Sequence, residues 1–480
     1  MNRKTVRRPG AAEATTVTAR ETARPEPFKL GRDGLVWLVF PALLVLSAME
    51  VLLSGRDLTQ SFLALQREVQ SLVESTRHPL LAWVQRGVSL MLIAVCLERM
   101  VSHVVQRKPV PAPMLTWTFL FFWLTTVAAP AVFSSHPSLS HEYLYPLLLG
   151  LACSLAGPGD RERIFAVTRN ALFVFLLASA ALIPVMPSLV LDTSYTQGLI
   201  PGLPRFGGLA THAVGMGMLA QTALVILWAR PLKHGWLNAA CWGLGLGALF
   251  LAQSKTAWLC FLLSGTCLMA VRRAPDAMQR AGDPRRSSFG VGLCLLVIGA
   301  VLAALVAVLA FDLPTAITDF FDTREGAQLA SLTGRDRIWV VAMEEWARQP
   351  VFGYGLTLWD AGYREAIGMP QATHAHNQMI DTLARSGTVG AVGLVLYALV
   401  LTVMAFRYAR ATGGLSLALY VSQALLSISE VPLILIDYGS HVMTHFLLIV
   451  AVASGAAARV QARAAPVVPI EPTLRTRTAP

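Results

Sequence analysis

One polar stretch of the chain, residues 312–386, concentrates side chains that could do chemistry. It holds the runs Leu332-Thr333-Gly334-Arg335-Asp336-Arg337, Pro350-Val351-Phe352-Gly353-Tyr354-Gly355 and His374-Ala375-His376-Asn377. A guanidinium can bind two phosphate oxygens at once, and a neutral imidazole can accept a proton near neutral pH. These residue types therefore favour a site that binds a phosphate group and activates a hydroxyl.

Arg335 and Arg337 stand at the start of a predicted amphipathic helix that ends at Pro350. Its apolar residues recur at helical spacing: Ile338, Trp339, Ala342, Met343 and Trp346. One interpretation is that the two arginines are a solvated helix end or touch lipid headgroups. The functional interpretation is a clamp on a phosphate, because the planar guanidinium matches two oxygens.

Two further cations lie earlier in the chain. Arg205 is surrounded by glycine and proline in Gly202-Leu203-Pro204-Arg205-Phe206-Gly207-Gly208, a composition typical of irregular backbone that lines a cavity. The alternative is an anchor at the edge of a span. Lys255 lies in the predicted hairpin Gln253-Ser254-Lys255-Thr256. This hairpin is predicted to lie outside the membrane, where lysine is disfavoured by the positive-inside rule, so a specific role for Lys255 is favoured.

Three polar residues complete the candidate site. His376 is the candidate general base, with Asn377 positioning it or capping the next helix. Glu430 stands in an apolar run, and an acid there is usually paired or functional. His374 and His376 could bind a metal ion, but no carboxylate stands at ligand spacing and no HExxH motif occurs. We therefore expect neither a metal nor another cofactor.

The elements that must position these residues are membrane spans. The chain has 480 residues, of which 55% are hydrophobic and 14% charged, and runs of about 20 apolar residues can cross a bilayer. We predict an all-α membrane protein, a polytopic bundle of about twelve transmembrane helices with one large periplasmic loop containing amphipathic helices. The predicted spans are 35–53, 81–105, 114–133, 142–157, 164–186, 207–229, 236–252, 256–271, 289–311, 387–406, 415–436 and 439–458.

The positions of the basic residues orient these spans. The net charge of +11 comes from short basic clusters between apolar runs, and such clusters are signals of membrane topology. The sequence has no basic face with interleaved aromatic residues, so we do not predict nucleic-acid binding. The polar stretch carries ten acidic residues against six arginines, so it is predicted to lie outside. The predicted parts are a disordered basic cytoplasmic tail (1–34), nine spans (35–311), the periplasmic loop (312–386), three spans (387–458) and a cytoplasmic tail (459–480).

These motifs in this order resemble the O-antigen ligase and polysaccharide polymerase superfamily. The resemblance rests on Leu332-Thr333-Gly334-Arg335, on Pro350-x-Phe352-Gly353-Tyr354-Gly355 and on His376-Asn377 with a downstream Gly387. Arg205-Phe206-Gly207-Gly208 and Gln253-Ser254-Lys255 match two weaker signatures. This chain departs from the pattern at Lys255, where family members often have arginine, and at Asp381 and Arg385, which replace apolar residues.

The resemblance implies a metal-independent glycosyltransferase of the bacterial inner membrane. Its donor would be an oligosaccharide on undecaprenyl diphosphate, presented at the periplasmic face. Arg335, Arg337, Arg205 and Lys255 would bind the diphosphate and His376 would act as base. Tyr354, His374, Asn377 and Glu430 are the remaining expected substrate-binding residues. Besides the bilayer, a chain-length regulator and a flippase are candidate partners.

Three functions remain open from the sequence. A polymerase would join repeat units of O-antigen or exopolysaccharide, and the Leu-Thr-Gly-Arg and His-Ala-His-Asn forms favour it. An O-antigen ligase would instead attach the glycan to lipid A core. A transporter for a lipid-linked sugar would need ionisable residues near the middle of several spans and a repeat symmetry. Glu430 is a candidate for such a residue, but the other charges lie at span edges.

Overall fold

The computed structural model describes residues 34–59, 78–195, 202–281, 335–370 and 372–464. Within these residues, six helical segments are long and apolar enough to cross a membrane. They are Leu35–Leu53 (η1, Leu35–Leu38, and α1, Val39–Leu53), Pro79–Val105 (α3), Pro113–Phe133 (α4, η2 and α5), Pro158–Ala181 (α7), Gln378–Arg407 (α17) and Ser440–Ala462 (η6 and most of α19). Each overlaps a predicted span.

The count of twelve spans is not confirmed. Three further apolar helices are shorter, namely α9 (Ala213–Ala229), α10 (Gly235–Leu251) and α18 (Leu415–Ser429). The predicted span at 142–157 holds only α6 (Leu144–Ser154), preceded by the 3-10 turn η3 (His141–Tyr143). The predicted span at 256–271 lies within α11 (Lys255–Ala281). The span predicted at 289–311 lies outside the described residues.

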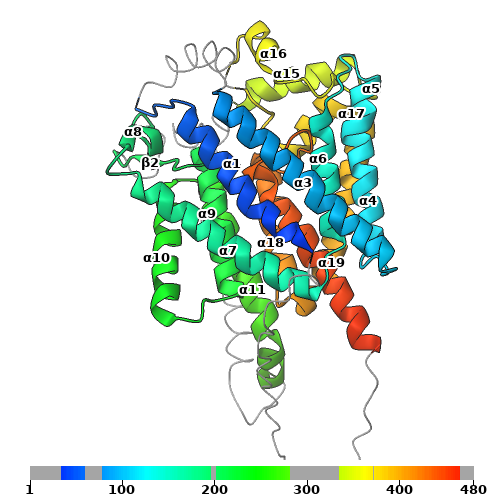
Figure 1. The fold of residues 1–480 in the computed structure, drawn as a ribbon. Helices are drawn as coiled ribbons and strands as arrows, with labels where there is room; N and C mark the ends of the chain where they lie inside the picture. The colour runs from blue at the N-terminus through cyan, green and yellow to red at the C-terminus, as the bar shows by residue number, and fades with distance from the viewer. Residues whose placement is uncertain (1–33, 60–77, 196–201, 282–334, 371, 465–480) are drawn as a thin grey trace, which may run out of the picture. The chain divides into compact units, whose positions relative to one another are not determined.

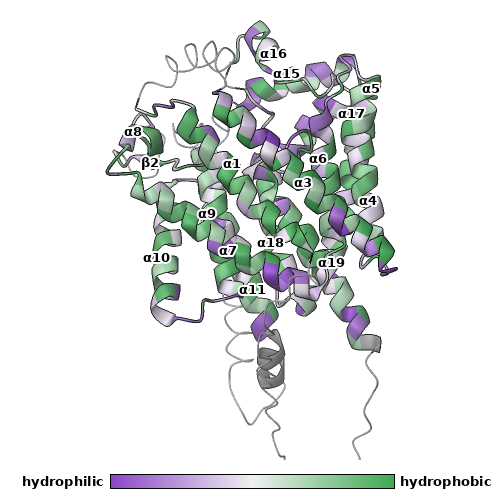
Figure 2. Ribbon diagram, viewed as in Figure 1, coloured by the Kyte–Doolittle hydropathy of each residue, from purple (hydrophilic) through white to green (hydrophobic). Residues whose placement is uncertain are grey.

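Apolar residues predominate along the helices of the bundle, as a lipid environment requires (Figure 2). On α3, Trp83, Leu90 and Val104 are 67%, 68% and 74% exposed. Helix α19 (Met443–Ala464, after the turn η6, Ser440–Val442) is the opposite case, because most of its apolar residues are buried between its neighbours. It contacts α6, α7 and α18 and forms the centre of the hydrophobic core (Figure 1).

Helix α17 is longer than the span predicted in this region. It begins at Gln378, includes the predicted span 387–406 and ends at Arg407, with non-helical backbone only at Gly387 (φ 63°, ψ −164°). A Cβ at Gly387 would lie 2.2 Å from the carbonyl oxygen of Val351, so the turn around Val351 packs directly on the helix. Only glycine adopts this backbone conformation readily.

Two helices of the polar stretch lie beside the end of α17 (Figure 1). Helix α15 (Arg335–Arg348) is the predicted amphipathic helix, and it packs against α17 through Ile338 and Ala342. Helix α16 (Ala361–Ala366) is short and begins with Asp360, whose side chain accepts a hydrogen bond from the Tyr363 amide. Residues 312–334 of the predicted periplasmic loop are outside the described residues.

The segment before α9 is irregular, as its glycines and prolines predicted. Strand β1 (Leu191–Asp192), which follows the short helix α8 (Pro187–Val190), pairs antiparallel with β2 (Arg205–Phe206) and sets Asp192 opposite Arg205. Arg56, just after α1, then fastens the turn. Its guanidinium donates hydrogen bonds to the carbonyl oxygens of Leu189, Gly208, Ala210 and Thr211 at 2.6–3.2 Å.

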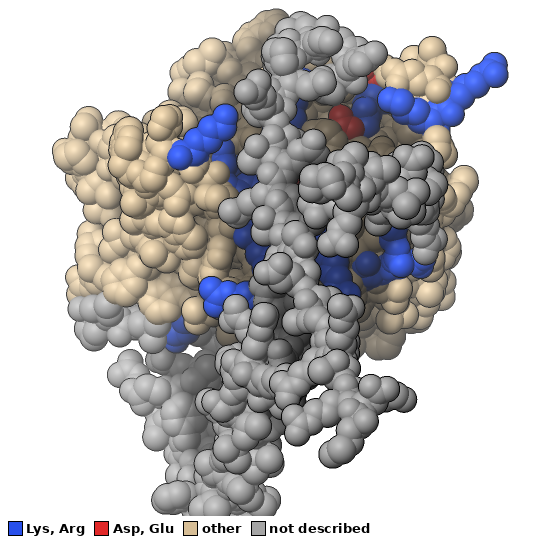
Figure 3. All heavy atoms as spheres, turned by 90° about the horizontal axis from the view of Figure 1, so that it is seen from below, with Lys and Arg blue, Asp and Glu red and all other residues tan. Residues whose placement is uncertain are grey.

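Two further described segments complete the bundle. Helix α4 (Pro113–Trp123) continues through the π-helical turn η2 (Leu124–Ala128) into α5 (Ala129–Phe133), and the 3-10 turn η5 (Arg410–Thr412) connects α17 to α18. Near η5, Arg272 donates hydrogen bonds to the carbonyl oxygens of Trp228, Ala229 and Gly413. This face of the molecule shows many lysines and arginines and few acids (Figure 3).

Candidate active site

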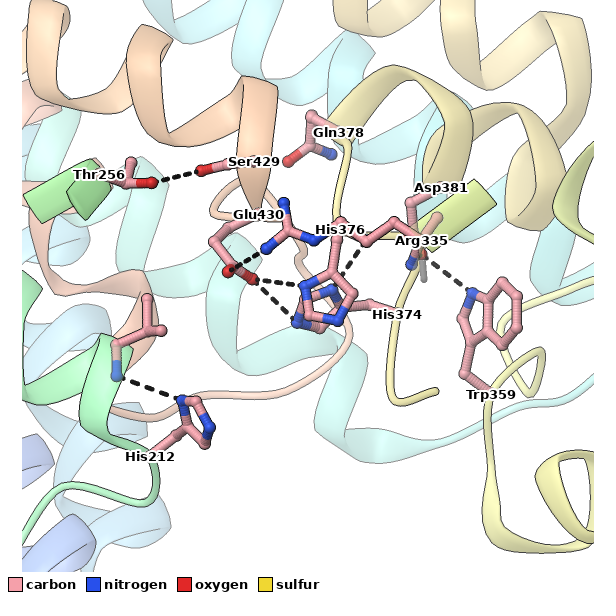
Figure 4. A network of polar contacts seen from close by, with 12 residues as sticks. His212, Thr256, Arg335, Trp359, His374, His376, Gln378, Asp381, Ser429 and Glu430 are labelled. Carbon is pink, nitrogen blue, oxygen red and sulfur yellow. Dashed lines mark hydrogen bonds and ion pairs between the residues drawn. The ribbon is translucent and has the colours of Figure 1, made fainter. Parts of the chain in front are cut away.

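Glu430 is the centre of a polar cluster at the end of α18. Its Oε2 lies 3.1 Å from Nδ1 of His376 and 3.3 Å from Nε2 of His374, and its Oε1 lies 3.6 Å from an arginine nitrogen of Arg335 (Figure 4). The four side chains are between 16% and 26% exposed, so a ligand can reach them. The predicted span 415–436 was too long, because α18 ends at Ser429 and Glu430 begins an irregular segment.

Hydrogen bonds assign the tautomers of the two histidines. The backbone N–H of His376 donates to Nδ1 of His374 at 3.1 Å, so the proton of neutral His374 is on Nε2 and points at Glu430. His376 donates its Nδ1–H to the same carboxylate. Nε2 of His376 therefore carries a free lone pair, which is what a general base needs.

The charge state of the cluster follows from its surroundings. Burial alone would raise the pKa of Glu430, but the hydrogen bond with His376 and the nearby His374 and Arg335 lower it below its ordinary value. Burial also lowers the pKa of His374 to about 4. At neutral pH the cluster thus holds an ionised Glu430 between neutral His374 and the cation of Arg335.

The turn that carries the histidines is held on both sides of Ala375. The Ala375 N–H donates to Oδ1 of Asp381 at 2.9 Å, and its carbonyl accepts a hydrogen bond from Nε1 of Trp339 at 2.7 Å. His376 has a left-handed backbone (φ 50°), which is uncommon for a residue other than glycine. Such strain persists only where neighbouring contacts fix the backbone, and it is often found in active sites.

A buried ion pair on α17 supports this turn. Nε of Arg385 lies 2.9 Å from Oδ2 of Asp381, and both side chains are less than 10% exposed. Asp381 also accepts the Trp359 indole N–H at 3.0 Å, and Arg385 donates to the Leu356 carbonyl at 2.7 Å. Asp381 and Arg385, which depart from the family pattern in the sequence, thus stabilise the turn that carries the two histidines.

Asn377 and Gln378 connect the start of α17 to the segment of Glu430. The Asn377 side chain caps α17 by accepting from the Met379 and Ile380 amides, and its Nδ2 donates to the Ile428 carbonyl. Oε1 of Gln378 accepts the Leu433 amide at 2.8 Å. These bonds on either side of Glu430 fix its distance from the histidines.

The cluster also has the residue types of a metal site. Single ligand atoms of His374, His376 and Glu430 all lie within 4.8 Å of one another, so the carboxylate that the sequence spacing lacked comes from a distant segment. The hydrogen bonds fit such a site poorly, however. Nδ1 of His374 already accepts a backbone N–H, so Nε2 is the protonated nitrogen and would have to lose its proton to bind a metal.

Arg205 and Lys255 come from two neighbouring segments. Nε of Arg205 donates to the Ala252 carbonyl at 3.0 Å, and its guanidinium stacks 4.4 Å over the Tyr195 ring. Gln253 donates to the carbonyls of Leu203 and Pro204. Lys255 is exposed at the first position of α11, and the next residue, Thr256, hydrogen-bonds Ser429 beside Glu430 (3.1 Å, Figure 4).

The structure does not bring every predicted site residue together. Arg337 is exposed on α15, since residues two apart on a helix point in nearly opposite directions, and only Arg335 reaches Glu430. The Tyr354 ring stacks on His136 at 3.9 Å and contacts Tyr363, away from the histidine cluster. Arg337 and Tyr354 therefore have no contact with the four central side chains.

Sequence reasoning missed several residues that build this region. Arg56 and His212 were not singled out, because a lone polar residue beside a span is usually structural. Asp381 and Arg385 were noted as departures, but their spacing of four residues was the available signal, since an i,i+4 pair meets on a helix.

The apolar helices define a membrane protein, and comparison with known families makes the class more specific. Residues 240–395 match the family model described as O-antigen ligase. For that part of the chain, this match supports the O-antigen ligase and polysaccharide polymerase superfamily and, with it, an activity of the glycosyltransferase type. The matched part includes Lys255, Arg335 and His376 but neither Arg205 nor Glu430. No curated protein matches the chain significantly.

Proposed function

We propose that this protein is an inner-membrane glycosyltransferase that moves a glycan from undecaprenyl diphosphate to a sugar hydroxyl at the periplasmic face. The observation that carries the proposal is the hydrogen bond between His376 and ionised Glu430, beside the cation of Arg335. It leaves a free basic nitrogen next to a group that binds phosphate. Base and cation are the two requirements of glycosyl transfer from a diphosphate.

The reaction would proceed by attack of the acceptor oxygen on the anomeric carbon of the donor. His376 Nε2 takes the hydroxyl proton as the new C–O bond forms. The bond between the anomeric carbon and the diphosphate oxygen breaks, and its electron pair leaves with the lipid diphosphate. Glu430 stabilises the imidazolium that forms, as the carboxylate does in a catalytic triad. A positioned base of this kind contributes about 10²- to 10⁴-fold in rate.

The leaving group needs positive charge more than it needs a proton. Arg335, Arg205 and Lys255 are the candidate cations, and Arg335 can exchange Glu430 for a phosphate oxygen. Helices α9, α11 and α17 begin at Ala213, Lys255 and Gln378, in the segments that carry His212, Lys255 and Asn377. Helix N-termini favour anions, so these ends support the same assignment.

The distribution of basic residues supports a periplasmic site. Arg272 lies seventeen residues after Lys255 on α11, which corresponds to about 26 Å along the helix axis. The end near Arg272 carries the clustered arginines and lysines (Figure 3) and is the cytoplasmic end by the positive-inside rule. The end with Lys255 and Glu430 then faces the periplasm.

Polymerisation of O-antigen or exopolysaccharide repeat units is the first candidate reaction, because the Leu-Thr-Gly-Arg and His-Ala-His-Asn forms of the motifs favour it. Ligation to lipid A core is the second, and the description of the matched family favours it. The two reactions share the donor and the base and differ in the acceptor. In a strain lacking the protein, loss of chain length indicates a polymerase, and loss of attachment to lipid A indicates a ligase.

The test is His376→Ala in such a strain. We expect transfer to fall by about 10²- to 10⁴-fold while the lipid-linked donor accumulates. Glu430→Gln should give a smaller loss, because the amide oxygen still accepts one hydrogen bond. Chelator treatment should leave transfer by the wild-type protein unchanged, since no step uses a metal.

His234→Ala is the matched control, because His234 is exposed before α10 and its side chain makes no capping hydrogen bond. It should retain full transfer. Normal product from His376→Ala would refute the assignment of the base. Loss of activity with a chelator, restored by a divalent metal, would instead support the His374–His376–Glu430 cluster as a metal site.

A further inference from the structure

His212 is an accessible histidine beside the proposed site that the reaction described above does not use. It is the last residue before α9, and its Nδ1 accepts the backbone N–H of Val214 at 3.2 Å as the cap of that helix. Because Nδ1 is the acceptor, the proton of neutral His212 lies on Nε2, and this N–H points away from the helix end. The residue is exposed, so this donor is available to a ligand.

His212 lies in the same region as the cluster of Glu430. Desolvation of the ring lowers the pKa of His212 to about 4; the charges of Arg205, His376 and Arg56 also lower it, and that of Glu430 raises it. Figure 4 draws His212 in the same close view as His374, His376 and Glu430. The imidazole is therefore neutral at physiological pH and remains a hydrogen-bond donor.

The backbone that carries His212 is held rigidly. Arg56 donates hydrogen bonds to the carbonyls of Gly208, Ala210 and Thr211, three of the four residues that precede His212. A Cβ at Gly208 would lie 2.9 Å from Cβ of Ser179, so this turn is also packed against α7. Arg205 stands at the other end of the same segment, paired through β2 with β1. A fixed donor and a fixed cation thus lie seven residues apart on one braced loop.

We infer that His212 donates its Nε2–H to an oxygen of the donor's diphosphate, on the opposite side of the reacting bond from His376. The inference rests on the proposed glycosyl transfer. The two histidines then have opposite tautomers and opposite roles, since His376 accepts a proton from the acceptor sugar and His212 keeps its own. The hydrogen bond to the diphosphate strengthens as the C–O bond breaks and negative charge gathers on the leaving oxygen.

Substitutions at His212 can separate the cap from the donor. Asparagine is a good helix cap but does not reach the position of Nε2, whereas glutamine can present an amide N–H near it. We expect His212→Asn to bind a polyprenyl diphosphate about 10- to 100-fold more weakly in nanodiscs, the usual effect of a lost hydrogen bond to a charged group. His212→Gln should recover most of the affinity. The ratio of the wild-type affinity to that of His212→Asn should be constant from pH 6 to 8, since the His212 ring is neutral throughout this range.

The chain supplies a matched control in His78, which caps α3 in the same way, with Nδ1 accepting the Leu80 amide at 3.2 Å. His78→Asn should bind the diphosphate like the wild type. Equal binding by His212→Asn and the wild type would overturn the inference. Equal weakening of binding by His212→Asn and His78→Asn would also overturn it, because it would indicate an effect of helix capping. If the wild type itself does not bind the diphosphate, the proposed function fails as well. Normal glycosyl transfer by His376→Ala would refute only the assignment of His376 as the general base.

Discussion

At the scale of single residues, the site depends on one carboxylate that two histidines and an arginine share. Glu430 and His376 are 54 residues apart in the chain, and both were recognised in the sequence as unusual. Their contact could not be predicted, because no periodicity relates a loop before α17 to the end of α18. The sequence therefore singled out these two residues but did not predict their contact.

The low pKa of His374 predicts how stability changes with pH. The folded pKa is about 4 and the ordinary value is 6.5, so between these values the unfolded chain binds the additional proton. Stability should fall as the pH falls from about 6.5 to 4. The surrounding charges are His376, Glu430, Asp381 and Arg385, and burial outweighs them.

We expect a plot of melting temperature against pH to be flatter for His374→Gln than for the wild type in the same detergent. His212 has a similarly low pKa and should keep part of the slope in that variant. Identical slopes for the variant and the wild type would show that His374 is not buried in its neutral form.

At the scale of elements, the helices were largely predictable, and the residues at which they end were less so. Hydropathy depends on the composition of an apolar run, but it does not indicate the residue at which the helical backbone hydrogen bonds end. Apart from Glu430, the run after Ser429 stays apolar through Ile436, so the predicted span continued to residue 436. Pro432 was the overlooked signal, since proline cannot continue a helix and restricts the residue before it.

The packing of α17 on the turn at Val351 predicts the effect of a single methyl group. Gly387→Ala adds a Cβ within 2.2 Å of a backbone oxygen at a left-handed φ. We expect a loss of about 2–4 kcal/mol of stability, from backbone strain and overpacking together. Thermal unfolding in detergent measures this loss.

Gly243→Ala is the control for that substitution. Gly243 lies within α10, and a Cβ there would meet nothing within 4 Å. In a helix interior alanine is favoured over glycine by about 0.5–1 kcal/mol, so this variant should be as stable as the wild type or slightly more so. Equal destabilisation by both alanines would show that the turn at Val351 moves freely.

At the scale of the whole molecule, the basic residues support the proposed orientation, which the helices alone do not address. The alternating charge of the loops could be read from the sequence, because it depends only on composition between spans. The assembly of the site could not, since it draws on α9, α11, α15, α17 and α18 at once. Those contacts depend on how the helices pack, which span prediction does not address.

Single cysteines can test this orientation in intact cells. Arg337→Cys on α15 should react with a membrane-impermeant thiol reagent from the periplasm, and Lys233→Cys between α9 and α10 should react only after the inner membrane is opened. Both positions are exposed. The native Cys96, Cys153, Cys241 and Cys260 are buried and should give little background. Labelling of both positions from the same side would refute the orientation.

The late position of Glu430 has a consequence for biosynthesis. The chain enters the membrane from its N-terminus, so Arg56, Arg205 and Lys255 are made and inserted long before the carboxylate that orients His376. Under the proposed function, a nascent chain holds the cations of the diphosphate site but has no oriented base until α18 is complete. We therefore expect glycosyl transfer to begin only once nearly the whole bundle has been made, and a chain that ends before residue 430 to hold donor lipid without using it.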